Sequence, residues 1–193
     1  MPKGRPRQFD TGDAIDTAMR VFWKCGYEGA SLDILTDEMG ISRPSLYAAF
    51  GNKEALFIKA LDRYRESPAS YVNRALAKRT AREVFESLLN GVIDLVTDPE
   101  NPGGCLFVSA SLGAPAVRNE LAARRLDGED EIRERFEQAR TEGDLPGGTD
   151  TRALAKLTAT LLWGISIQGM NGATKSELRK AAKLAAVAFP GDQ

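Results

Sequence analysis

The sequence contains no histidine, and only two of its 193 residues are cysteines. Histidine is the commonest general base and the commonest metal ligand of proteins, so its absence excludes Ser-His-Asp and Cys-His catalysis and histidine-ligated zinc. Cys25 and Cys105 form neither a zinc-binding spacing nor a disulfide framework. We therefore expect no metal, no cofactor and no enzymatic activity, and we expect a reducing, cytoplasmic location.

Long apolar runs are also missing. No stretch approaches the roughly 18 apolar residues of a membrane-spanning helix, and the basic residues 1–7 lack the apolar core of a secretion signal. The alternation typical of strands is absent too, whereas apolar residues recur at helical spacing between clusters of glycine and proline. The sequence predicts an all-α protein of about nine helices with no membrane partner.

Residues 31–57 carry the most specific pattern of the chain. Ser31 is a suitable N-cap for a short helix, and Gly40 can end that helix in the left-handed conformation. After a tight turn, Ser42 can cap the next helix, with Pro44 in the first turn, where a missing N–H costs little. Two short helices joined in this way, with a further helix before them, predict an N-terminal three-helix domain that contains a helix-turn-helix.

The apolar positions of these two helices separate an inner face from an outer face. Ile34, Leu35 and Met39 give the first helix an apolar stripe, and Leu46 and Phe50 face inward from the second. The second helix presents its remaining side chains outward, as a recognition helix does toward the major groove of DNA. The outward residues are Arg43, Ser45, Tyr47 and Ala48.

Several of these residues suit contacts with DNA, and each has a simpler alternative. Arg43 can form a bidentate pair with guanine O6 and N7, or it can be a solvated side chain. Tyr47 can donate to a phosphate or pack in the core, and Lys53 can contact a phosphate or be merely solvated. The helix capped by Ser31 can offer its free N–H groups to a phosphate, which is compatible with simple capping.

Residues 1–8 contain Lys3, Arg5 and Arg7 and no acidic residue, although the formal net charge of the chain is −1. Arginines on a flexible arm can enter a narrow, A·T-rich minor groove. The alternative is a tail that serves only solubility. We predict that Arg5 and Arg7 contribute to a DNA-binding domain that spans residues 1–52.

Two motifs carry a family resemblance. Residues 42–47 read Ser-Arg-Pro-Ser-Leu-Tyr, and residues 50–57 read Phe-Gly-Asn-Lys-Glu-Ala-Leu-Phe. With the helical remainder and the segments 103–108 and 168–173, they make the chain resemble the TetR family of bacterial transcriptional regulators. The resemblance implies a homodimer paired through its last two long helices, a palindromic double-stranded DNA operator, and a small-molecule effector that releases the protein. A repressor is the expected role.

The chain departs from the family pattern in its recognition helix. The family often has Tyr-His where this chain has Ala48 and Ala49, so contacts to phosphates and thymine methyl groups there are lost or replaced by smaller ones. The resemblance implies phosphate contacts by Tyr47 and Lys53 and groove-facing positions for Arg43 and Ser45. The full set of expected DNA-binding residues is Arg5, Arg7, Ser31, Arg43, Pro44, Ser45, Tyr47, Ala48 and Lys53.

Residues 53–193 are expected to form a second helical domain for dimerisation and effector binding. Its segments 151–169 and 175–189 combine leucine and isoleucine with small residues that allow close helix packing. We predict that they pair across a two-fold axis, although burial in the domain's own core is the alternative. Other expected helices cover residues 11–25, 81–97 and 116–142, and residues 68–78 are a short helix or an irregular connector.

An apolar effector pocket with few polar groups is expected where these helices converge, although core packing is the alternative for each residue. The predicted lining is Phe85, Leu89, Phe107, Phe136, Trp163 and Ile167, with Ser109, Ser111 and Gln168 as polar anchors. Cys105 follows two glycines at a helix start, where the helix dipole can lower a thiol pKa. A redox- or electrophile-responsive regulator acting through Cys105 is therefore an alternative to ligand release, and a purely structural cysteine is the simpler interpretation.

Overall fold

The computed structural model describes residues 9–109 and 115–190. Within them the chain forms ten helices and no strand, which confirms the all-α prediction. None of these helices is long and apolar enough to cross a membrane. One helix more than expected is present, because residues 71–76 are helical. The helices are α1 (Thr11–Gly29), α2 (Leu32–Met39), α3 (Arg43–Phe50), α4 (Lys53–Glu66), α5 (Tyr71–Leu76), α6 (Ala81–Val96), α7 (Leu106–Ser109), α8 (Pro115–Thr141), α9 (Thr151–Met170) and α10 (Lys175–Val187).

The helix-turn-helix of α2 and α3 begins and ends where its capping residues predict. The Ser31 hydroxyl accepts a hydrogen bond from the Ile34 N–H at 3.2 Å, and the Ser42 hydroxyl accepts one from the Ser45 N–H at 3.3 Å. Gly40 ends α2 in the left-handed conformation, with φ of 64°. Local hydrogen bonds and one glycine therefore set the turn between the two helices.

The first helix extends beyond its predicted end at residue 25. Gly26 interrupts it with φ of 70° and ψ of 174°, but a further helical turn follows to Gly29. Tyr27 in this turn stacks on Phe22, with ring centroids 6.0 Å apart, and meets Phe57 edge-on at 5.1 Å. These aromatic contacts hold the extra turn against the core.

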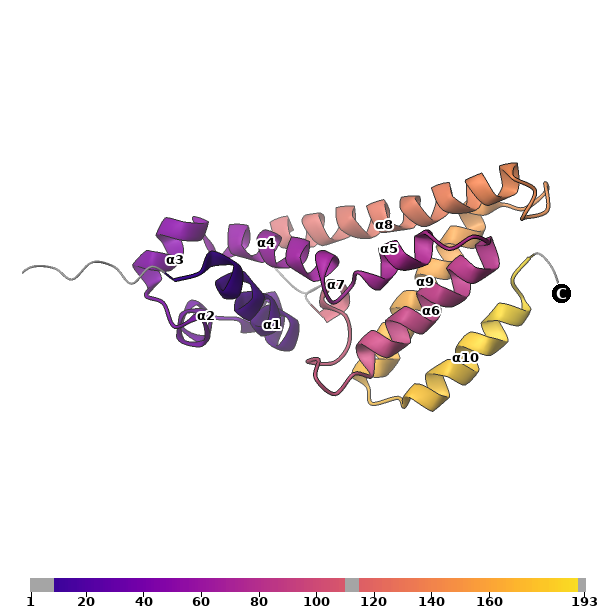
Figure 1. Ribbon diagram of the computed structural model, residues 1–193. Coiled ribbons are helices and arrows are strands. Elements are labelled where there is room, and N and C mark those ends of the chain that lie inside the picture. The colour runs from indigo at the N-terminus through magenta and orange to yellow at the C-terminus, as the bar shows by residue number, and fades with distance from the viewer. Residues whose placement is uncertain (1–8, 110–114, 191–193) are drawn as a thin grey trace, which may run out of the picture.

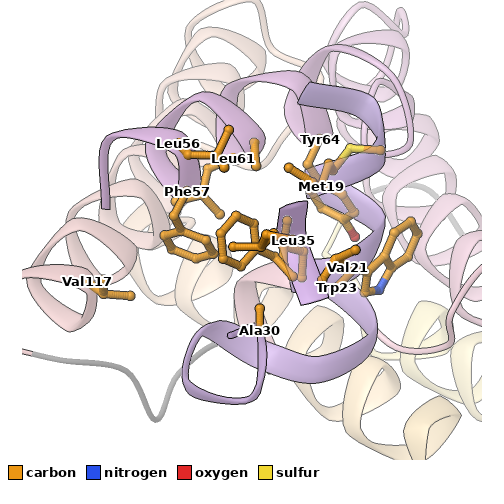
Figure 2. Close-up of a cluster of buried hydrophobic side chains, with 14 of the residues drawn as sticks. Met19, Val21, Trp23, Ala30, Leu35, Leu56, Phe57, Leu61, Tyr64 and Val117 are labelled. Carbon is orange, nitrogen blue, oxygen red and sulfur yellow. The ribbon is translucent and has the colours of Figure 1, made fainter. Parts of the chain in front are cut away.

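The first of two hydrophobic cores lies beneath the helix-turn-helix, and Figure 2 shows Leu35 among the side chains of α1 and α4. Leu35, Leu46 and Phe57 are fully buried. Ile34 is 41% exposed, so the predicted apolar stripe of α2 is wrong at this position. The reason is the rotation of α2, which turns Leu35 and Thr36 inward.

Helix α4 joins this first core to the second half of the chain. Leu56, Phe57 and Leu61 of α4 share the core with Val117 and Leu121 of α8. From there α8 runs along the molecule to its opposite end (Figure 1). A boundary after residue 52 stays a prediction, and α4 itself packs with the helices on both sides of it.

The second core surrounds α6, which contacts α5, α8, α9 and α10. Leu88 and Val92 of α6 are buried there. Phe189 closes the core beyond α10, with its ring centroid 4.7 Å from Phe85 and 5.8 Å from Phe136. Full burial of a side chain of this size contributes about 1.5–3 kcal/mol, so these contacts dock α10 on α6.

We predict that Gly91→Ala destabilises the fold. A Cβ at Gly91 in α6 would lie 2.2 Å from Cδ2 of Tyr71, so the tyrosine ring must move, at a cost of about 1–3 kcal/mol in unfolding free energy. Gly128→Ala in α8 is the matched control, because its Cβ meets only Nη1 of Arg65 at 3.9 Å; this variant gains about 0.5–1 kcal/mol of stability. Urea unfolding measures both, and equal stability of the two variants contradicts the prediction.

Candidate nucleic-acid interface and internal cavity

The recognition helix α3 is held in place by its buried inner face and by a capped N-terminus. Leu46 and Phe50 are buried, and the ring of Phe50 lies 6.2 Å from that of Phe9. The Ser42 and Ser45 hydroxyls are 2.9 Å apart and share a hydrogen bond. The half-buried Ser45 is thus engaged in the helix cap, and its hydroxyl faces the solvent less freely than the sequence predicts.

The outer face of α3 is open to solvent. Arg43, Pro44, Tyr47 and Ala48 are all exposed. Tyr47 is 47% exposed, which rules out the alternative of a core tyrosine. Because Arg43 and Tyr47 are four residues apart, their side chains are neighbours on one side of the helix. The structure therefore brings the predicted contact residues of α3 together on one accessible surface.

Arg43 has an intramolecular partner that the sequence analysis missed. Its Nε and Nη2 both donate to Oδ1 of Asp33, at 3.0 and 2.5 Å. This hydrogen bond and the charge of Asp33 raise the pKa of Arg43. Asp33 lies in the first turn of α2, where the helix dipole favours a carboxylate. A cation at the start of α3 therefore has a local reason to be there, besides any contact with DNA.

Lys53 also has a partner within the protein. Its Nζ lies 4.4 Å from the centroid of the Tyr27 ring, a cation–π contact. Burial of the amine lowers the pKa of Lys53. At the same turn, the Asn52 side chain caps α4 by accepting from the Ala55 N–H at 2.7 Å. Lys53 is thus fixed at the start of α4 rather than merely solvated.

The predicted basic arm with Arg5 and Arg7 lies outside the described residues. The first described residue, Phe9, packs on Phe50 of α3, so the chain enters the fold beside the recognition helix. Ser31 caps α2 and is exposed. Capping does not prevent the N-terminus of α2 from meeting a phosphate, and this contact remains a prediction.

A cavity of about 100 Å³ lies where α4 to α9 converge. Phe107 and Trp163 line it, as the sequence predicts. Tyr64, Tyr71 and Cys105 line it as well, and the two tyrosines were missed. The detectable signal for Tyr64 was a phenol at the end of an otherwise apolar stripe of α4.

Other predicted lining residues lie elsewhere. Phe85, Leu89 and Phe136 are buried in the second core and do not line this cavity, which fits the core-packing alternative. Ile167 and Gln168 are exposed on the outer surface of α9 and do not line the cavity. The helical period in the sequence shows which side chains share an apolar face. It does not show which other helix, or which cavity, that face packs against.

The two predicted serine anchors have different outcomes. The Ser109 hydroxyl donates to the carbonyl oxygens of Trp23 and Leu106, both at 3.4 Å, and does not line the cavity. Ser111 lies outside the described residues. The serine that does reach the cavity is Ser166 of α9.

Cys105 lies on the cavity wall just before α7. Burial raises the pKa of its thiol, against smaller lowering effects from the nearby Tyr64 side chain and from nearby backbone N–H groups. This direction is opposite to the effect predicted from a helix start. The placement of Cys105 therefore gives no support to the redox alternative, because a raised pKa reduces the thiolate fraction.

Comparisons with known proteins agree with this geometry. The family model "Bacterial regulatory proteins, tetR family" matches residues 14–60, and the tetracyclin repressor-like C-terminal domain matches residues 82–185. The transcriptional repressor ComR of Escherichia coli (strain K12) is 30% identical over 186 residues, covering 93% of this chain and 89% of ComR. The transcriptional activator FasR of Mycolicibacterium smegmatis is 35% identical over 117 residues, covering 60% of this chain and 53% of FasR.

A solved structure is similar over nearly the whole chain. It is a cysteine-substituted TetR-family regulator, CifR, in complex with 26-bp double-strand operator DNA. It matches with a TM-score of 0.92 and 42% sequence identity, covering 96% of this chain and 100% of the CifR chain.

An accessible recognition helix, set on a buried helix-turn-helix core and joined through α4 to a helical domain with a cavity, defines a DNA-binding transcriptional regulator. The chain belongs to the TetR family of bacterial regulators. It is accordingly a DNA-binding transcriptional regulator, in a family of regulators rather than enzymes.

The ion pair of Asp33 and Arg43 leads to a prediction for DNA binding. Asp33→Asn removes a negative charge from the DNA-facing surface and frees Arg43, so we expect tighter operator binding. The slope of log K against log salt concentration steepens by about one for each bound subunit. Fluorescence anisotropy over a salt series measures both quantities. Asp130→Asn removes an acid from an exposed arginine pair on α8 and is the control; an Asp33 variant that behaves like it contradicts the prediction.

Proposed function

We propose that this chain is a dimeric cytoplasmic repressor that binds a palindromic operator and dissociates when a small molecule occupies the cavity. One observation carries the proposal. The buried face of α4 packs beneath the helix-turn-helix, and the end of the same helix supplies Tyr64 and Arg65 to the cavity wall. A single rigid element thus connects the effector site with the DNA-binding surface. The similarity to the repressor ComR over most of both chains supports repression.

The dimer is supported by apolar side chains on the surface of the last two helices. Leu184 and Val187 of α10 are 75% and 70% exposed, and Ile167 and Met170 of α9 are exposed as well. Apolar surface of this kind is typical of an interaction site. A two-fold pairing there places two recognition helices on one duplex, with half-sites about 34–36 Å apart, and requires a palindromic operator.

Three contacts link α1 to the cavity wall or to the segment that precedes α7. Trp23 of α1 donates from Nε1 to the Gly104 carbonyl at 3.2 Å, and its ring meets Tyr64 edge-on with centroids 4.9 Å apart. Arg20 donates from Nη2 to the Glu100 carbonyl at 2.6 Å. A ligand that displaces Tyr64, or the segment before α7, therefore also moves α1 and the helices packed on it.

Footprinting on the DNA upstream of the gene tests the proposal. We expect a short protected region with two-fold symmetry, and loss of protection when the effector is added. Deleting the gene raises transcription from that promoter if the protein is a repressor, whereas a fall identifies an activator. Uniform protection of any duplex contradicts operator recognition and indicates an architectural DNA-binding protein.

We predict that Leu184→Glu yields a monomer, because a carboxylate in the paired surface is desolvated without a partner. The expected result is a monomer mass by analytical ultracentrifugation at micromolar concentration, together with weakened operator binding. Leu126→Glu on α8 is the control, since Leu126 is 58% exposed but lies outside the two pairing helices. A wild-type protein that is itself monomeric refutes the dimer.

We further propose that the arm containing Arg5 and Arg7 contacts the minor groove; the position of Phe9 against α3 supports this proposal. Deleting residues 1–8 removes Lys3, Arg5 and Arg7. The expected result is weaker operator binding and a salt slope that is flatter by roughly two to three for each bound subunit. Anisotropy titrations at several salt concentrations provide the measurement, and an unchanged slope removes the arm from the interface.

A further inference from the structure

One hydroxyl on the cavity wall is buried and unpaired. Tyr64 is completely buried, and its O–H has no hydrogen-bond partner among the residues that the structure describes. The ring is fixed by edge-on contacts with Trp23 and with Phe107, whose centroid lies 5.4 Å away. Burial and the neighbouring Cys105 raise the pKa of Tyr64 far above its usual value, so the phenol stays neutral and acts as a donor. Because an unpaired buried donor is costly, a ligand that offers an acceptor there is favoured.

The charged side chains of the wall are already engaged. Arg65, Arg124, Arg125 and Glu129 all reach the cavity. Their partners are Glu131 for Arg65, Asp62 and Glu120 for Arg124, the Phe107 carbonyl for Arg125, and Lys156 for Glu129. An ion entering the cavity loses its hydration and has to compete with these existing pairs. The wall therefore favours an uncharged molecule.

The remaining wall is apolar and the space is small. Val92, Leu95, Ile132 and Leu162 contribute aliphatic surface from α6, α8 and α9. The cavity of about 100 Å³ is smaller than an engineered apolar cavity of about 150 Å³ that binds benzene, which has six carbon atoms. By this comparison the cavity admits a molecule somewhat smaller than benzene, of roughly four or five non-hydrogen atoms.

We infer that the cavity takes a small uncharged ligand with an apolar body and one hydrogen-bond acceptor, such as a ketone or ether oxygen, which accepts from the Tyr64 hydroxyl. The inference rests on the proposed function and names the chemical class of its effector. It also places the ligand against the ring that contacts Trp23 of α1.

Three probes of five non-hydrogen atoms each separate the possibilities. Butanone carries a carbonyl acceptor, 2-methylbut-1-ene is its hydrocarbon isostere, and propanoate carries a charge. The chain has only two tryptophans; Trp163 lines the cavity and Trp23 contacts Tyr64. Their two indole N–H signals in ¹⁵N-labelled full-length protein report binding in the absence of DNA. We expect butanone to bind about five-fold more tightly than 2-methylbut-1-ene, and propanoate to bind most weakly.

Tyr64→Phe removes the hydroxyl and keeps the ring. We expect this variant to melt at the same temperature or higher, because the deleted group has no partner in the fold. It should bind both neutral probes with equal affinity, so that the five-fold preference disappears. Tyr71→Phe removes the other phenol of the wall and should keep the preference.

Several results overturn the inference. Equal binding of the two neutral probes to the wild type, tightest binding of propanoate, or no indole shift from any probe up to its solubility limit each refutes it. If the preference for butanone survives in Tyr64→Phe but is lost in Tyr71→Phe, then Tyr71 is the donor and the inference is wrong. The titration contains no DNA, so a failure of operator binding refutes the proposed function without affecting this result. Butanone binding that leaves the operator complex intact refutes effector release but not the ligand class.

Discussion

The contact between Trp23 of α1 and Tyr64 of α4 is the constraint on which both halves of the protein depend. Both side chains are almost completely buried, and their rings meet edge-on. Trp23 also donates a hydrogen bond to the Gly104 carbonyl, and the Tyr64 ring also contacts the ring of Phe107. Buried aromatic pairs are among the larger contributions to a small core. A displacement of either ring therefore reaches both the helices of the DNA-binding half and the wall of the cavity.

The sequence was sufficient for features that are decided within one or two helical turns. Capping by Ser31 and Ser42 involves N–H groups only three residues away, and Gly40 acts through its own backbone. The inward positions of Leu46 and Phe50 follow from the helical period alone. For this reason the helix-turn-helix and its outward face could be predicted almost residue by residue.

Features that depend on a second element could not be predicted in this way. Asp33 and Arg43 come from different helices, as do Tyr27 and Lys53. Phe85 is as apolar as any residue of the cavity wall, yet it packs against the ring of Phe189 in the second core. Periodicity shows that a helix has an apolar face, whereas the packing of the whole domain decides whether that face meets a core, a cavity or another subunit.

The small cavity sets a limit on how regulation can work in the proposed function. Even the most efficient small ligands gain about 1.5 kcal/mol per non-hydrogen atom, so a molecule of roughly five atoms supplies about 7 kcal/mol at most. Reversing a two-state population from 1:99 to 99:1 needs a differential affinity of about 5.5 kcal/mol. Such a ligand therefore reverses a population this biased only if most of its binding free energy is specific to the released conformation. In the proposed interface, DNA has to compete with Asp33 for Arg43, which weakens the DNA-bound state and reduces the bias that the ligand must overcome.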